Sequence, residues 1–540
     1  MQLDPVSLEV LKGQLRAITD EMGVALQRAS YSPNIKTRKD HTCSLFDARL
    51  EMVAQTAHQI GHLGAFPYIM KTTMREHRVE DLRPGDQIIV NDPYRGGTHI
   101  PDIIMLAPVF VGERLWGYVA NLAHHTDVGG MTPGSMPGNA TEIFQEGLRI
   151  PSVKLFRGGA LQHDLLKLIL ANVRTPEERK GDLAAQVAAN NLGARRVQQL
   201  VARYGFDTLA AYAAELIAYA ERRMRAELAR IPDGEYAGVD YLDDDGVDER
   251  PIKNCTYYQT MSLVMYTLRC LTDPDIPQNE GIYKPVRLVV PSGRALNAQF
   301  PAAVAAGWEI SRRTIDALCR ALQAAIPDRV PAGSNGAMNQ FSFGGRRLDG
   351  SHYAYYETHG GGFGARPTKD GMDGVHSVSN TMNTPIEELE LFYPLVVRRY
   401  ALRVGSEGAG RYRGGLGLAR ELEFLTDATL SVISDREVHR PWGIAGGEEA
   451  AGSDFRVVSA SAERRLGTKA VARITAGERV LINTAGGGGF GRPRERDREA
   501  LARDVADGKV AAERARAVYG WEGPEPRLRG AWRRGSPPGG

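Results

Sequence analysis

Two short clusters of candidate metal ligands and proton carriers lie on either side of an apolar stretch of the chain. The clusters comprise His99 and Asp102 in N-D-P-Y-R-G-G-T-H-I-P-D (91–102), and His124, His125 and Asp127 in A-H-H-T-D-V-G-G (123–130). Imidazole and carboxylate side chains are the groups that hold divalent transition ions and move protons. Turn residues flank both clusters, which is typical of loops that converge on a site.

The sequence between the two clusters predicts a β-hairpin. Residues 103–110 and 115–122 are short apolar runs rich in strand-forming residues, and residues 111–114 between them suit a turn. A hairpin brings its outer ends side by side. One cluster precedes the first strand and the other follows the second strand, so both should meet at the open end of the hairpin.

This pattern predicts a site for one divalent transition metal ion, with His99, Asp102 and His124 as ligands. Two imidazoles and one carboxylate suit Mn, Zn or Fe better than Ca or Mg, which prefer shells of oxygen. Three protein ligands leave positions open for water or substrate. Asp127 or His125 could then orient a ligand or move a proton. The alternative is that these loop residues only hold turns together.

Length and composition restrict the class of protein. A chain of 540 residues is too long for one simple core, so two or more lobes are expected. The net charge of +2, from 67 basic and 65 acidic residues, indicates neither a nucleic-acid nor a membrane partner. Four scattered cysteines without a CxxC pair suit a reducing cytoplasm. We expect no signal peptide and no transmembrane helix.

The periodicity of apolar residues predicts an α+β protein with several lobes. The expected parts are an N-terminal α/β region with the candidate metal site (1–235), a β-rich region with glycine clusters (236–495), and a C-terminal helix with a disordered tail (496–540). In the first part, Asp4 and Pro5 should open a helix that ends near Ala29. Two long helices, 183–204 and 209–228, should follow.

The second half of the chain has the spacing of short strands. Strands are expected at 258–268, 286–290 and 421–425, with one helix near 312–325. Near the C-terminus, a charged helix at 496–507 should precede a shorter helix and then a disordered tail.

A second pair of histidines, His58 and His62, is spaced four residues apart. On a helix the two side chains would share a face. Such a pair is more often structural than catalytic, so we assign both histidines a structural role and keep a catalytic one as the alternative.

Glycine clusters at 360–362, 414–417 and 486–489 raise the question of phosphate binding. None is followed by the Gly-Lys-Ser/Thr of a Walker motif, and none forms a dinucleotide-binding fingerprint. The run 484–491 could present backbone N–H groups to an anion. The favoured interpretation is a tightly turned loop packed against another backbone, so we expect this chain to have no ATP site of its own.

Seven motifs, spread over nearly the whole chain, resemble the hydantoinase B/oxoprolinase family. This family includes B subunits of ATP-dependent N-methylhydantoinases, the C-terminal half of 5-oxoprolinase, and a large subunit of acetone and acetophenone carboxylases. The motifs are S-P-N-I-K-T-R-K-D (32–40), the two stretches quoted above (91–102 and 123–130), E-T-H-G-G-G-F-G-A-R (357–366), N-T-P-I-E-E-L-E (383–390), G-R-Y-R-G-G-L-G (410–417) and T-A-G-G-G-G-F-G-R-P (484–493). One departure is G-W-E-I-S (307–311), where the family usually has Asn after Gly and Thr before Ser, which should alter the substrate pocket.

The resemblance implies a cytoplasmic hetero-oligomer in which the reaction is divided between two subunits. A partner A subunit with an actin-like ATPase fold uses the ATP and phosphorylates the carbonyl oxygen of a cyclic amide. This chain then hydrolyses the activated C–N bond. In the carboxylase branch, a Mn-type ion is held by a His-x-x-Asp pair and a later His, which correspond to His99, Asp102 and His124. His125 and Asp127 are then candidates for the base and its orienting carboxylate.

Two other functions stay open. The chain could be the metal-containing subunit of an ATP-dependent carboxylase that acts on a ketone such as acetone or acetophenone. It could also be a non-enzymatic scaffold for the ATPase.

Overall fold

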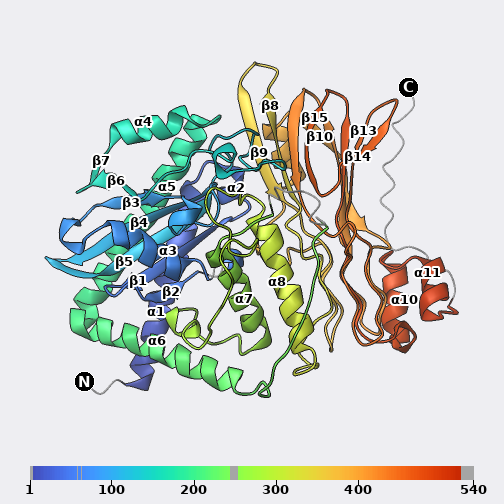
Figure 1. Cartoon of the computed structure of the whole chain (residues 1–540), viewed down its shortest axis with the longest axis horizontal. Coiled ribbons are helices and arrows are strands. Elements are labelled where there is room, and N and C mark those ends of the chain that lie inside the picture. Colours follow the sequence, from blue (N-terminus) through green and yellow to red (C-terminus); the bar gives the residue numbers. More distant parts are fainter. Residues whose placement is uncertain (1–3, 57–58, 63, 244–252, 524–540) are drawn as a thin grey trace, which may run out of the picture.

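The computed structural model describes residues 4–56, 59–62, 64–243 and 253–523. In Figure 1 an N-terminal sheet with its helices lies on the left, two helices lie in the middle, and two upright sheets lie on the right. This arrangement confirms the predicted α+β class. No helix in the described ranges is long and apolar enough to span a bilayer.

The N-terminal sheet carries the predicted hairpin. Its strands are β1 (His41–Asp47), β2 (Met52–Gln55), β3 (Gln87–Val90), β4 (Asp102–Val111), β5 (Arg114–His124), β6 (Val153–Arg157) and β7 (Ala160–Leu161). They pair antiparallel in the order β2-β1-β5-β4-β3-β6-β7. The central pair, β4 and β5, confirms the hairpin, and its strands extend outward until Asp102 pairs directly with His124.

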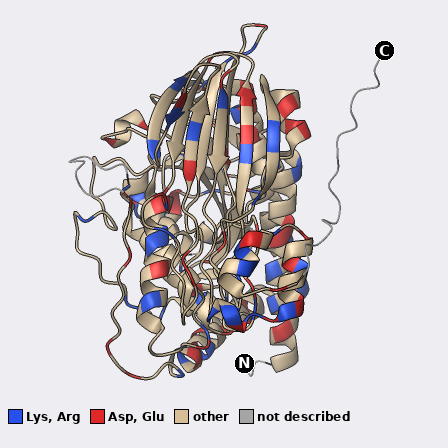
Figure 2. Cartoon of the chain, turned by 90° about the vertical axis from the view of Figure 1, so that its right-hand side faces the viewer, with Lys and Arg blue, Asp and Glu red and all other residues tan. Residues whose placement is uncertain are grey.

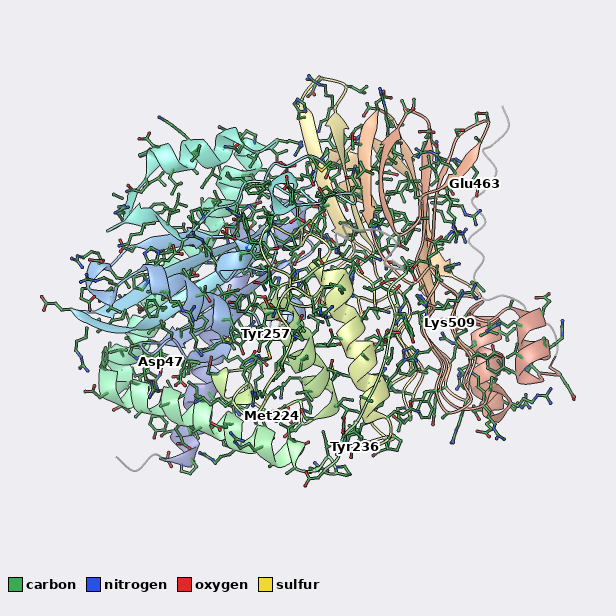
Figure 3. All side chains as sticks on the ribbon, viewed as in Figure 1. Asp47, Met224, Tyr236, Tyr257, Glu463 and Lys509 are labelled. Carbon is green, nitrogen blue, oxygen red and sulfur yellow. The ribbon has the colours of Figure 1, made fainter. Side chains whose placement is uncertain are left out.

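Helices cover both faces of this sheet, so its strands are apolar on both sides. Successive residues of a strand point to opposite faces. Leu45 packs with α1 (Pro5–Ala29) and α5 (Pro176–Tyr204), whereas Phe46 packs with α3 (Phe66–Thr73) and α7 (Tyr257–Leu271). The core around Phe46 also contains Met224 on α6 (Phe206–Leu228), and Tyr257 on α7 packs against it. Figure 3 labels both residues.

The predicted N-terminal helices are present, but α5 and α6 begin earlier than predicted, at Pro176 and Phe206 instead of 183 and 209. Helix α1 begins at Pro5 because Asp4 caps it, with Asp4 Oδ2 accepting from the Ser7 N–H at 2.8 Å, and it ends at Ala29 as predicted. Helices α5 and α6 are separated by Gly205, whose φ of 86° favours glycine. The short helices α2 (Pro33–Lys36) and α4 (His163–Ala171) complete this part.

Two strand predictions in the second half are wrong. Residues 258–268 lie in helix α7, and residues 286–290 form no strand. Every residue from Gln259 to Met265 is buried, so this part of α7 is surrounded by protein. Buried positions there face every direction around the helix, so periodicity alone does not separate this stretch from a buried strand. The predicted helix near 312–325 is α8, which spans Gly307–Leu322.

The two upright sheets pack face to face. One has the order β15-β12-β8-β9, and the other β10-β11-β16-β13-β14. Their bounds are β8 (Gln340–Arg346), β9 (His352–Thr358), β10 (Leu395–Arg403), β11 (Gly417–Phe424), β12 (Ala428–Ile433), β13 (Asp454–Val458), β14 (Glu463–Arg465), β15 (Lys469–Ile474) and β16 (Arg479–Asn483). A shared core that includes Phe343, Phe424 and Ile482 joins them. The strand predicted at 421–425 is confirmed as part of β11.

Below these sheets, the glycine clusters form layers of closely packed backbone. A Cβ added to Gly415, Gly487 or Gly488 would lie 2.0 Å or less from a carbonyl oxygen of a neighbouring segment. The N–H groups of residues 486–489 donate to the carbonyls of Ala451, Gly415, Gly333 and Glu448. The interpretation of these clusters as loops packed against other backbone is therefore confirmed, and these four N–H groups are not directed at an anion.

The C-terminal helices lie beside the glycine layers. Helix α10 (Arg498–Ala506) is the predicted charged helix and α11 (Ala512–Tyr519) is the shorter one, while α9 (Ile386–Phe392) precedes β10. The tail predicted to be disordered lies outside the described residues. On the side shown in Figure 2, acidic and basic residues are interspersed along the strands, as in the pair of Arg398 and Glu423 at 2.6 Å.

Candidate metal centre

His99, Asp102 and His124 meet at the open end of the hairpin, as predicted. Asp102 Oδ2 lies 2.8 Å from His99 Nδ1, and Asp102 Oδ1 lies 3.2 Å from His124 Nδ1. One candidate ligand atom from each residue can be chosen such that all lie within 4.8 Å of one another. All three side chains are buried. We refer to these three residues as the triad.

Local sequence explains how the triad is positioned. Asp102 is the first residue of β4 and His124 the last of β5, so the sheet register sets their separation. His99 precedes β4 in a turn closed by a bond from the Asp102 N–H to the His99 carbonyl at 3.0 Å. Asn91 braces this loop, because its side-chain amide donates to the carbonyls of Ile100 and Leu148. The stretch 91–102 therefore braces, through its own Asn91, the loop that presents His99.

The donor set of the triad fits a divalent transition ion. Two imidazole nitrogens and a carboxylate are the ligands that Mn, Zn and Fe accept. Nε2 of His124 is buried and has no hydrogen-bond partner among the residues that the structure describes. A buried polar atom without a partner is costly, so a ligand for it is expected.

The electrostatics of the triad favour an ionised carboxylate. Burial opposes ionisation of Asp102, but His99 and His124 together hold its pKa well below its usual range. Burial also opposes the charged form of His99, and Asp102 outweighs this effect and raises the His99 pKa. Burial lowers the pKa of His124, which favours the neutral imidazole that a metal requires.

His62 is a further histidine beside the triad. It ends the short 3-10 helix η1 (Ile60–His62), and its Nε2 lies 3.8 Å from Asp102 Oδ2. Its Nδ1 is 3.0 Å from the Thr42 hydroxyl, and burial lowers its pKa. The sequence interpretation gave His62 a structural role, because histidine pairs of this kind are more often structural. No spacing rule connects His62 with Asp102, so the sequence carried no signal of their proximity. His58 lies outside the described residues.

Asp40 adds a second carboxylate close to these histidines. It ends the first motif of the resemblance, and it accepts hydrogen bonds from Gln59 at 3.0 Å and Asn34 at 3.4 Å. Its negative charge raises the pKa of each of the three nearby histidines, His62, His99 and His124. Asp40 therefore adds negative charge to the site beyond that of the triad.

Two aromatic side chains from the second half of the chain form walls of the site. Tyr356 on β9 stacks on His124, with ring centroids 4.2 Å apart. Trp308, at the start of α8, meets His99 edge to face at 6.2 Å and lies 5.9 Å from His62. The departure from the family pattern at 307–311 therefore lies beside the triad, and its effect on a substrate pocket stays a prediction.

Buried carboxyl groups hold the segments that carry these walls. Glu146 accepts from the N–H groups of Val304 and Ala305, both at 2.7 Å, just before α8. Glu309, next to Trp308, accepts from the N–H of Met338 at 2.9 Å. Burial raises the pKa of Glu146 to about 8 and that of Glu309 to about 7.

His125 and Asp127 lie away from the triad. His125 follows His124 directly and points to the opposite face, where its Nε2 is 3.0 Å from the Gln186 side-chain oxygen on α5. Asp127 accepts from the N–H groups of Gly129 and Gly134 and from the Arg174 side chain, each at 3.0 or 3.1 Å. The structure gives both residues bracing contacts, and their catalytic roles stay predictions.

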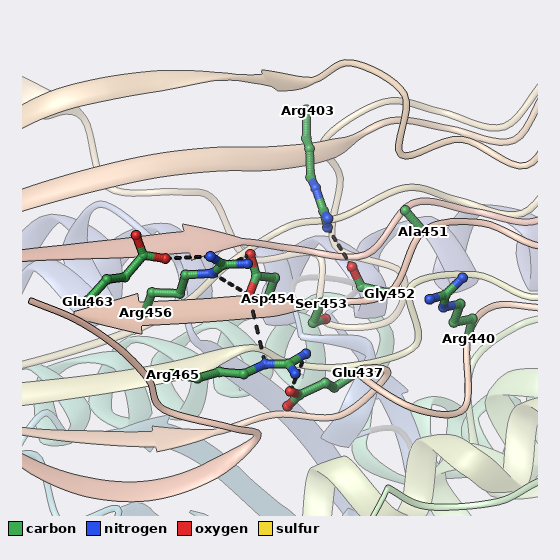
Figure 4. Close-up of a pocket in the computed structure, with 10 residues that line it drawn as sticks. All are labelled: Arg403, Glu437, Arg440, Ala451, Gly452, Ser453, Asp454, Arg456, Glu463 and Arg465. Carbon is green, nitrogen blue, oxygen red and sulfur yellow. Dashed lines mark hydrogen bonds and ion pairs between the residues drawn. The ribbon is translucent and has the colours of Figure 1, made fainter. Parts of the chain in front are cut away.

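A hollow of about 530 Å³ on the five-stranded sheet has a different character. Figure 4 shows its acidic side chains paired with arginines. Asp454 lies 2.8 Å from Arg456, Glu437 lies 2.6 Å from Arg465, and Glu463 pairs with Arg456. These are surface ion pairs, and the triad is the stronger candidate for chemistry.

The comparisons with known proteins agree with this architecture. The hydantoinase B/oxoprolinase family model matches residues 4–253 and 250–493, and the chain belongs to this family. It is 39% identical to an uncharacterized protein of Methanocaldococcus jannaschii, with 96% of each chain covered. It is 32% identical to a protein of Pseudomonas sp. that is named as the B subunit of a D-/L-hydantoinase, over 96% of this chain and 95% of that one.

A solved structure has the same fold over nearly the whole length. The ATP-dependent caprolactamase of Pseudomonas jessenii superposes with a TM-score of 0.89 at 31% sequence identity. The superposition covers 96% of each chain. The similarity therefore includes the N-terminal sheet, the central helices and the two upright sheets.

Proposed function

We propose that this chain is the hydrolytic B subunit of an ATP-dependent enzyme that opens a cyclic amide. In this proposal, a partner A subunit with an actin-like ATPase fold phosphorylates the carbonyl oxygen of the substrate. The buried triad at the open end of the hairpin carries the proposal. Similarity to a caprolactamase and to the protein named as a hydantoinase B subunit, over nearly full length, supports the choice of a cyclic amide.

The division of labour follows from amide chemistry. An amide resists attack by water because resonance strengthens its C–N bond and its leaving group is poor. Phosphorylation of the oxygen weakens this resonance and makes the carbon more electrophilic. Water adds to the carbon, the C–N bond breaks as the nitrogen takes up a proton, and a second water hydrolyses the resulting acyl phosphate to a carboxylate and inorganic phosphate. The second subunit then has to direct water at the activated carbon.

The residues of this chain have distinct roles in that step. His99, Asp102 and His124 would hold a divalent ion, which supplies Lewis acidity at this point. His62 is kept neutral by burial and can accept a proton from the attacking water. Trp308 and Tyr356 confine the substrate and exclude bulk water, which strengthens the electrostatic interactions inside the site.

The test is to co-express the chain with an A subunit and to assay the purified complex. ATP turnover is measured against a panel of cyclic amides and ketones, with and without bicarbonate. We expect a cyclic amide to stimulate ATP hydrolysis and to yield the ring-opened product without bicarbonate. Product from a ketone only in the presence of bicarbonate would identify a carboxylase instead. If the two chains do not co-elute on gel filtration, the subunit assignment is wrong.

A further inference from the structure

A cavity of about 250 Å³ lies between α7, α8 and the glycine-rich loops. Its walls are largely apolar and include Ile315, Phe363 and Trp442. Helix α8 connects this cavity with the candidate metal centre. Trp308 on that helix contacts His99, and Arg312, about one helical turn later, lines the cavity.

Arg312 is the unusual feature of this cavity. Its side chain is buried, with 1% of the residue exposed. The guanidinium donates to the Ala337 carbonyl at 3.1 Å and to the Ser377 hydroxyl at 3.3 Å, and it forms no ion pair with a carboxylate in the described part of the chain. Burial lowers its pKa to about 10. Burying a charge is costly unless it is paired, so this cation needs a counter-ion.

Other charged residues of the cavity do not supply that counter-ion. Asp316 also lines the cavity, but Arg436 and Arg313 engage it at 2.9 and 3.3 Å. Arg329 is itself a cation, and it pairs with Glu227 at 3.8 Å. Glu309, three residues earlier on α8, acts on Arg312 electrostatically, but both of its oxygens accept from the Met338 N–H at 2.9 Å. Arg312 therefore has no directly paired carboxylate within the described residues.

A second arginine lies on the same cavity, and it too has no acidic partner among the residues that the structure describes. Arg366 ends the motif E-T-H-G-G-G-F-G-A-R, and its guanidinium lies 5.9 Å from the Phe363 ring. Its one side-chain hydrogen bond in the described residues is to the Asp370 backbone carbonyl at 3.5 Å. The motif thus brings an arginine and an aromatic ring to the wall of the cavity.

We propose that this cavity binds the anionic oxygen group of a small organic molecule, with Arg312 as the buried counter-ion and Arg366 as a second contact. Both a carboxylate and a phosphoryl group match the planar fork of a guanidinium. The apolar walls would hold the body of the molecule. Assigning the anion to the activated substrate rests on the proposed function, and it draws on helix α8, which carries Trp308 beside His99 and Arg312 at the cavity. The presence of an anion site in this chain does not depend on it.

Isothermal titration calorimetry on the purified full chain tests the proposal without any partner or ATP. The probes are phenyl phosphate, benzoate and the neutral benzyl alcohol. We expect at least one anion to bind more tightly than the alcohol, and the stronger of the two identifies the preferred group. Arg312→Gln should weaken anion binding at least about tenfold, because a charge-assisted hydrogen bond is lost. Arg366→Gln should weaken it less.

Matched variants make the outcome decisive. Arg398→Gln removes an arginine outside the cavity, which pairs with Glu423 on the five-stranded sheet, so anion affinity should stay unchanged. Circular dichroism shows whether Arg312→Gln is folded. If it is not, Arg312→Lys replaces it, because lysine keeps the charge but loses the planar fork. This variant should also bind the anions more weakly than the wild type. The proposal is wrong if neither anion binds the wild-type chain, or if the folded Arg312 variant binds them equally well. Failure of the ATP-dependent assay with normal anion binding would refute only the proposed function.

Discussion

Trp308 is the residue through which the site should select its substrate. Its ring stands beside His99 and His62, and Glu309 next to it is fixed by the Met338 N–H. We predict that Trp308→Ala raises the kcat/KM ratio of a large over a small cyclic amide by roughly tenfold. Removing the indole ring takes apolar contact away from the smaller substrate, which weakens its binding, and makes room for the larger one. A change of a few methylene-sized contacts in a pocket alters selectivity by roughly tenfold.

Competition assays with two lactams of different ring size on the purified complex measure this ratio. Trp521→Phe is the control, because Trp521 packs with α10 and α11 and should leave the ratio unchanged. An unchanged ratio in Trp308→Ala would show that this ring does not face the substrate.

His62 should act on protons and not as a metal ligand. Its Nε2 is 3.8 Å from Asp102, and its other nitrogen is held by Thr42. His62→Gln is therefore expected to keep its metal and its partner while kcat falls by about 10²- to 10⁴-fold, the usual contribution of a general base. Metal analysis beside steady-state kinetics separates the two roles. Loss of the metal in this variant would make His62 a ligand.

At the scale of elements, the hairpin could be predicted because its strands and turn are local in sequence. The alternation along β5 explains what the prediction missed. The strand continues to His124, so the next residue, His125, points to the α5 face. Reading the two histidines as one cluster overlooked the period of two along a strand.

The other differences also have physical reasons. Helix α7 was predicted as a strand because its stretch from Gln259 to Met265 is buried on every face, which obscures the period of 3.6 residues. His62 and Trp308 reach the triad only through tertiary packing, and sequence spacing carries no signal of that. The resemblance did mark 307–311 as unusual, and the structure shows that this segment borders the triad.

The glycine layers predict a strong effect of one methyl group. In Gly487→Ala, the new Cβ would lie 2.0 Å from the Phe363 carbonyl oxygen, and backbone on both sides leaves no room for relaxation. We expect a loss of more than about 3 kcal/mol in the free energy of unfolding, at the upper end of overpacking effects. Urea denaturation followed by circular dichroism measures it.

Gly13→Ala provides the opposite expectation. Gly13 lies within α1, and a Cβ there would meet nothing within 4 Å. Alanine should stabilise the helix by about 0.5–1 kcal/mol. A Gly487→Ala variant as stable as the wild type would contradict the close packing described for the glycine layers.

At the scale of the whole molecule, the site needs both halves of the chain. Strand β9 belongs to an upright sheet, yet its Tyr356 faces His124, while its neighbours Tyr355 and Glu357 point into the sheet interior. Asp40 and Trp308 come from two further segments. The site therefore forms only when the N-terminal sheet, α8 and the upright sheets are packed together.

The buried charges beside β9 should make the fold sensitive to acid. The pKa of Glu357 is held at about 2, because Arg420, His359 and Arg38 outweigh the effect of burial. Burial lowers the pKa of His359 to about 4. Both values lie below those of an unfolded chain, so their stabilisation is complete above about pH 6.5 and is lost as the pH falls toward 2.

Urea midpoints between pH 7 and pH 3 measure this dependence. Glu357 alone should contribute on the order of 3 kcal/mol, from a pKa difference of roughly two units. In Glu357→Gln, the decline below pH 4.5 should become shallower, although the variant is less stable at pH 7 because Arg420 loses its partner. Parallel slopes for the two proteins would contradict the assignment.

The metal content of three purified proteins tests the central assignment most directly. Wild type, His124→Gln and His125→Gln are expressed with the partner subunit, confirmed to be folded, and analysed by inductively coupled plasma mass spectrometry. His124 and His125 are adjacent, but they face opposite sides of the sheet. We predict about one divalent transition ion per chain in the wild type and in His125→Gln, and a steep loss in His124→Gln, because removing one of three ligands weakens binding strongly. Full metal occupancy in folded His124→Gln, or a wild type without metal after growth in metal-supplemented medium, would contradict the account.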